Sequence, residues 1–151
     1  MRLNLGPRPF LQLFALSALF VAQGCAVLDD RTPEEIVEAR AIERVNLLMA
    51  GDYDEAYLYT TPGYRSTEGV GRYGTRWAGT SMWVSASIKS VKCPVVDGTE
   101  GAPTRCKVAM QVEYRFIAAG SASGINKTVL FEDWIYTGGN WFLYQKIANG
   151  V

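Results

Sequence analysis

The chain has 151 residues, the length of one ordinary domain. It carries 15 Lys and Arg against 15 Asp and Glu, and it contains no histidine. This charge balance argues against nucleic-acid binding, for which a basic face would be needed. The lack of histidine removes the commonest zinc ligand and the usual activator of a catalytic nucleophile, so we expect neither a metal nor a cofactor.

The N-terminus has the pattern of an export signal. Residues 1–9 contain Arg2 and Arg8 but no acid, and residues 10–22 are apolar except for Gln12 and Ser17. This apolar run is short for the ~30 Å hydrocarbon core of a membrane, but it fits the core of a signal peptide. We therefore predict that residues 1–24 are a removable signal. Cleavage would remove two basic residues and no acidic one, which leaves a formal charge of −2.

The residues Val21-Ala22-Gln23-Gly24-Cys25 resemble the lipobox of bacterial lipoproteins. The resemblance implies that Cys25 carries the lipid and that residues 25–31 form a lipidated tether. Ala26, in place of an Asp, implies the outer membrane, facing the periplasm. Ala22-Gln23-Gly24 also fits an ordinary signal-peptidase site, which would instead leave a soluble protein with an unmodified Cys25.

Helical signals follow the tether. Residues 32–35 (TPEE) form a capping box with Pro at the first helical position, which predicts a helix from this point to a left-handed cap at Gly51. A second short helix is expected from Asp52 to about Tyr59, ended by residues 61–63 (TPG). Residues 67–77 are expected to form a further helical turn or a loop.

From Met82 onward the apolar period changes to two, which predicts half-buried antiparallel strands. The expected strands begin at Met82, run through residues 108–116, and then occupy residues 128–136 and 140–147, with a turn at Gly138-Gly139. Helices followed by strands predict an α+β fold, with N-terminal helices packed on a curved four-stranded antiparallel sheet over residues 32–151.

Cys93 and Cys106 are left over once Cys25 is assigned to lipid. The periplasm favours disulfides, so we predict that the two residues form a bond, with two free thiols as the alternative. This pairing sets odd residues of one strand opposite even residues of the next. The apolar faces would then mismatch unless a bulge lies near Pro94.

Three segments together resemble NTF2-like (SnoaL-like) proteins: residues 50–57 (AGDYDEAY), residues 61–65 (TPGYR), and the strand pair with residues 132–134 (EDW) and 141–143 (WFL). The resemblance implies a cone-shaped α+β domain whose mouth can hold an apolar ligand. Members of that family include isomerases, dehydratases and cyclases, and also domains without chemistry.

Candidate catalytic groups are few. A carboxylate in an apolar pocket has a raised pKa and can shuttle protons, and the candidates are Asp133 and Glu132 with Tyr114 as a donor. Tyr136 and Tyr144 are further donors. Asp133 and Glu132 are adjacent in a strand, so they point to opposite faces and cannot form a dyad. Glu113 lies on the polar face of its strand, where we expect it to be solvated.

These observations favour a non-catalytic protein anchored at the outer membrane, which binds a protein partner or a small apolar ligand through its cone or its sheet. The resemblance to NTF2-like proteins also implies a homodimer formed through the open sheet faces. The alternative is a small isomerase or cyclase-type enzyme that uses a pocket carboxylate.

Overall fold

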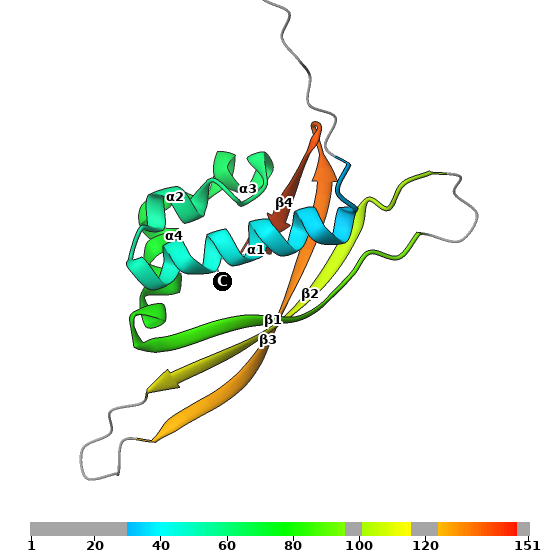
Figure 1. The fold of residues 1–151 in the computed structure, drawn as a ribbon. Helices are drawn as coiled ribbons and strands as arrows, with labels where there is room; N and C mark the ends of the chain where they lie inside the picture. Colours follow the sequence, from blue (N-terminus) through cyan, green and yellow to red (C-terminus); the bar gives the residue numbers. More distant parts are fainter. Residues whose placement is uncertain (1–29, 96–100, 116–123, 148–151) are drawn as a thin grey trace, which may run out of the picture.

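The computed structural model describes residues 30–95, 101–115 and 124–147. The predicted signal peptide and Cys25 lie outside these ranges. Within them the chain is an α+β domain, as predicted, with helices on one face of a four-stranded antiparallel sheet (Figure 1). No helix in the described part of the chain is both long and apolar enough to span a membrane.

The first helix, α1, covers Pro33–Ala50, and its ends are those predicted. The Thr32 hydroxyl accepts a hydrogen bond from the Glu35 backbone N–H at 3.3 Å, and the Glu35 carboxylate accepts one from the Thr32 N–H at 2.7 Å. Gly51 ends the helix with φ of 82°, a conformation that favours glycine. Val37, Ala41 and Val45 of α1 are buried against the sheet, and Leu48 is buried in a second cluster with Ala56, Tyr64 and Tyr73 of the short helices.

Four short elements connect α1 to the sheet: α2 (Tyr53–Tyr57), α3 (Pro62–Thr67), α4 (Val70–Trp77) and the 3₁₀ helix η1 (Ala78–Met82). The helix expected from Asp52 ends before residues 61–63, as predicted, since α2 stops at Tyr57. The sequence analysis missed that Thr61 and Pro62 also begin α3, because the Thr61 hydroxyl accepts the Tyr64 N–H at 3.1 Å and Pro62 occupies the first turn.

The sheet has the order β1-β2-β3-β4, so that each strand pairs with its neighbour in sequence. Its strands are β1 (Trp83–Lys92), β2 (Arg105–Arg115), β3 (Ile125–Thr137) and β4 (Asn140–Tyr144). Gly138 and Gly139 form the last turn with φ of 57° and 81°, a pair of positive values that suits a two-residue hairpin. The strands twist strongly, and α1 crosses one face of the sheet (Figure 1).

Cys93 and Cys106 form a disulfide, as predicted. The bulge that this pairing needs lies at Lys89, in the middle of β1, and not near Pro94. Ile88 pairs with Met110 and Ser90 pairs with Ala109, so Lys89 is the extra residue. Because Lys89 is an extra residue, the alternation of inward and outward side chains in β1 shifts by one position after it. The apolar side chains on both sides of the bulge therefore point inward.

Candidate functional site

A buried ion pair occupies the space between α1 and the sheet. An Arg44 Nη1 donates to Glu132 Oε1 at 2.5 Å, and the Trp134 indole N–H donates to Glu132 Oε2 at 3.0 Å. Arg44 lies on α1 and is 0% exposed, while Glu132 lies on β3 and is 8% exposed. Both oxygens of the Glu132 carboxylate are therefore bonded to other side chains of the interior.

Two aromatic rings from α4 complete this arrangement. Arg44 Nε donates to the Tyr73 hydroxyl at 3.2 Å, and the guanidinium lies 4.5 Å from the centre of the Trp77 ring. The Tyr73 hydroxyl in turn donates to the Ala56 carbonyl at 3.2 Å. Burial is the main reason why the pKa of Tyr73 is raised, with the nearby Arg44 acting in the opposite direction. The network joins α1, α4 and β3 and fills the interior.

The structure does not bring together the predicted catalytic candidates. Glu132 is buried and Asp133 is exposed, on opposite faces of β3 as predicted. Tyr114 pairs with Asn126, which is six residues from Glu132 along β3, or about 20 Å at the rise of an extended strand. Among the described residues, no tyrosine hydroxyl is hydrogen-bonded to Glu132. The Tyr73 hydroxyl is linked to Glu132 only indirectly, because both accept hydrogen bonds from Arg44.

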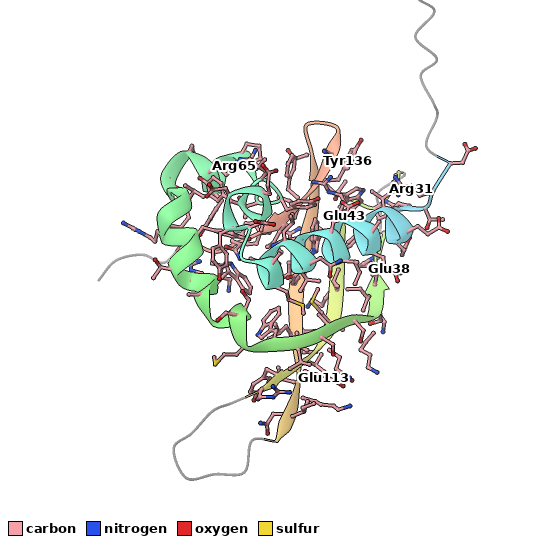
Figure 2. The ribbon with its side chains drawn as sticks, turned by 60° about the vertical axis from the view of Figure 1, so that its left-hand side comes forward. Arg31, Glu38, Glu43, Arg65, Glu113 and Tyr136 are labelled. Carbon is pink, nitrogen blue, oxygen red and sulfur yellow. A yellow bond between two sulfur atoms is a disulfide. The ribbon has the colours of Figure 1, made fainter. Side chains whose placement is uncertain are left out.

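The remaining candidates lie on the surface. Glu113 forms an ion pair with Lys127 at 2.7 Å, and the hydrogen bond from Lys127 is the main reason why the pKa of Glu113 is lowered. Figure 2 shows Glu113 near the end of the sheet, away from α1. Tyr136 and Tyr144 are both about half exposed, at 48% and 45%. Within the described residues, no three His, Cys, Asp or Glu side chains are grouped so that they could hold a metal ion.

The face of the sheet that points away from the helices, here called the outer face, is the second candidate region. On β3 it carries Val129 and Phe131, whose exposed fractions are 44% and 71%. Their partners across β2 are Gln111 and Ala109. An exposed phenylalanine beside small neighbours on an uncovered sheet face is typical of an interaction surface.

A depression of about 480 Å³ adjoins this apolar strip on the outer face. The ring of Tyr144 and the side chain of Ile135 provide apolar surface there, and Asp133 pairs with Tyr144 across the strands. The residues that line it are Pro94, Arg105, Cys106, Lys107, Asp133, Trp134, Ile135, Tyr144 and Lys146. The sequence analysis missed this depression, because its lining comes from three strands that only the sheet register brings together.

No family model matches the sequence, and no curated protein matches it. The solved structures that are similar to the chain include two SEC-C motif containing proteins. One is a SEC-C motif containing protein from Rhodopseudomonas palustris, with 14% identity, 72% of this chain and 74% of the other covered, and a TM-score of 0.52. The other is a SEC-C motif containing protein from Psychrobacter arcticus, with 8% identity, 82% and 67% covered, and a TM-score of 0.56. At these identities the likeness concerns the fold alone.

These neighbours correct the resemblance drawn from the sequence. Assignment to lipoproteins with an NTF2-like domain was wrong, because the similar structures are SEC-C motif containing proteins. The physical reason is that the matched segments perform structural roles that are common to many folds. Gly51 caps a helix and Trp134 fills the core, which many α+β folds require. Modification of Cys25 stays a prediction from the sequence.

Proposed function

We propose that this chain is a non-catalytic binding protein of the cell envelope, and that the outer face of its sheet binds a protein partner. The observation that carries the proposal is the exposed apolar strip of β3, where Phe131 is 71% exposed and Val129 is 44% exposed. Large apolar side chains that gather on an uncovered face favour protein association.

The filled interior favours a protein partner over a small apolar ligand. Arg44 and Glu132 occupy the space between α1 and the sheet, and Trp134 packs beside them with 0% exposure. A ligand in this space would have to displace a bonded ion pair, which leaves buried charges uncompensated. The same bonds disfavour the alternative of an isomerase or cyclase-type enzyme, since a proton shuttle needs a carboxylate oxygen that can reach substrate.

We place the protein at the outer membrane, facing the periplasm. The disulfide between Cys93 and Cys106 supports an oxidising compartment, and the predicted signal in residues 1–24 supports export. Attachment to the membrane through Cys25 is part of this proposal. Intact mass spectrometry of protein extracted from membranes tests it, because two or more acyl chains add several hundred daltons to the chain that begins at Cys25.

Photo-crosslinking in cells of the source organism tests the binding surface. A benzophenone amino acid replaces Phe131 in one version of the protein and Glu38, which is exposed on α1, in the control (Figure 2). We expect a discrete adduct from position 131 and none from position 38. Adducts at neither position, or the same smear at both, would contradict the proposal. Pairing of two copies through this face would give an adduct of twice the chain mass.

A further inference from the structure

We infer that the depression beside Tyr144 binds an acidic segment of a polypeptide, one that inserts an aromatic or aliphatic side chain between flanking carboxylates. The inference rests on the proposed function and specifies the chemistry of the partner. It is drawn from the charges around the depression, from the register that places them, and from its hollow shape.

The charge of the lining is strongly one-sided. Arg105, Lys107 and Lys146 are all exposed there, against the single carboxylate of Asp133. Among the residues that the structure describes, no ion pair joins Arg105, Lys107 or Lys146 to a carboxylate, in contrast to pairs such as Lys127–Glu113. Three cations around one hollow that contains a single carboxylate attract an acidic partner.

The sheet register places these charges next to apolar surface. Lys107 pairs with Asp133, which pairs with Tyr144 on its other side, and Arg105 pairs with Ile135 in the next row. Cross-strand neighbours lie about 5 Å apart at their Cβ atoms, so each cation borders the apolar part of the hollow. A bulky side chain held against Tyr144 and Ile135 thus brings acidic residues beside it within reach of Arg105 and Lys107.

Exposed acidic side chains lie on α1, which carries Glu35, Glu38 and Glu43. Around the depression on the outer face, cations outnumber carboxylates instead. A local excess of this kind can exist in a chain of near-neutral composition, which is why the net charge did not indicate it.

A polypeptide segment fits this site better than an anionic membrane surface does. The site is a hollow of about 480 Å³, which accepts a side chain, whereas a membrane surface requires protruding groups. Asp133 also lies between Lys107 and Tyr144, where it would repel a uniform layer of phosphates. In a peptide complex the same carboxylate can accept a backbone N–H.

Fluorescence anisotropy with the full mature, disulfide-bonded protein tests the inference. The probe is a labelled peptide of Glu, Phe and Gly, compared with versions that have Lys for Glu or Ala for Phe. We expect the acidic aromatic peptide to bind and the other two to bind at least tenfold more weakly, with affinity falling as salt rises. The double variant Arg105→Gln/Lys107→Gln should lose about tenfold in affinity, since charge-assisted hydrogen bonds are lost.

Lys127→Gln is the matched control. Lys127 also lies exposed on the outer side of β3, but it is paired with Glu113 and is away from the depression. Its variant should bind like the unchanged protein. Urea midpoints of all variants should agree, since every substituted residue is exposed.

Three results would overturn the inference: equal binding of the Lys-containing peptide, equal loss in Lys127→Gln, or binding to phosphatidylglycerol vesicles without binding to the peptide. If one of these results occurs while position 131 still gives its crosslink, the inference of an acidic partner is refuted, and the proposal that the outer face binds a protein is not. Loss of the crosslink itself would instead refute the proposed function.

Discussion

Replacing Glu132 by Gln removes a negative charge from the interior while it keeps the shape of the side chain. In the native chain the side chains of Arg44 and Glu132 are only 1% and 8% exposed, and their charged atoms are 2.5 Å apart. In the variant the guanidinium stays buried without a counter-charge, although the Gln oxygen can still accept the Trp134 indole N–H. We therefore expect the free energy of unfolding to fall.

The expected loss is about 3 to 5 kcal/mol, the range for removal of one partner from a buried ion pair. Domains of this size unfold with about 5 to 15 kcal/mol, so the variant should lose a large fraction of its stability. Arg44→Met should lose a similar amount. The double variant Glu132→Gln/Arg44→Met should lose less than the two single losses together, because no uncompensated charge remains in it.

Urea unfolding followed by tryptophan fluorescence measures all four proteins, since Trp134 lies beside the pair. A loss below about 1 kcal/mol in Glu132→Gln would refute the reasoning, because that is the size of an exposed pair. Losses that simply add in the double variant would show that the two charges do not interact.

Other parts of the account give four further expectations. Cys93→Ser/Cys106→Ser should lose about 3 kcal/mol, because a closed loop spanning 13 residues is opened, and reductant should then have no further effect on urea unfolding. Gly51→Ala should lose about 1 to 2 kcal/mol of unfolding free energy in the same assay, because a φ of 82° is unfavourable for alanine. The loss should not be larger, because an added Cβ meets no atom within 4 Å. Burial raises the pKa of Tyr73 above 10.0, so its contribution to stability is full below pH 10 and is lost as the pH rises through the folded pKa; Tyr73→Phe should show a shallower decline in alkaline unfolding curves. Phe131→Ser should change the unfolding free energy by less than about 0.5 kcal/mol, because that ring is 71% exposed.

The parts of the fold predicted from the sequence are those that depend on local signals. The limits of α1 follow from the Thr32 cap and from Gly51, and the last hairpin follows from two glycines. The Thr61-Pro62 pair was interpreted only as the end of the preceding helix, which does stop before it, although the pair also caps and begins α3. A bulge was expected because the disulfide sets odd residues of one strand opposite even residues of the next. Its position at Lys89 follows only from the strand register, in which Ile88 pairs with Met110 and Ser90 with Ala109.

The interior pair could not be predicted, because its partners are 88 residues apart in sequence. Arg44 looks like a solvated residue of a helix, and the one local signal for its burial is its position on the face of Ala41 and Leu48, three residues after the first and four before the second. Glu132 was identified as one of two alternating carboxylates, but alternation alone does not say which of them faces inward. Phe131 was missed for the same reason, since β3 has apolar residues on both of its faces.

Hydroxyl-radical footprinting tests the central claim most directly, because it compares the exposure of single side chains in the purified protein and in the intact cell envelope. Phe131 and Tyr144 report on the outer face, and Leu58, which is 53% exposed beside α2, is the internal control. The account predicts that oxidation of Phe131 and Tyr144 falls severalfold in the envelope while oxidation of Leu58 is unchanged. Equal oxidation of all three residues in both samples would show that nothing covers the outer face, and would contradict the proposed binding function.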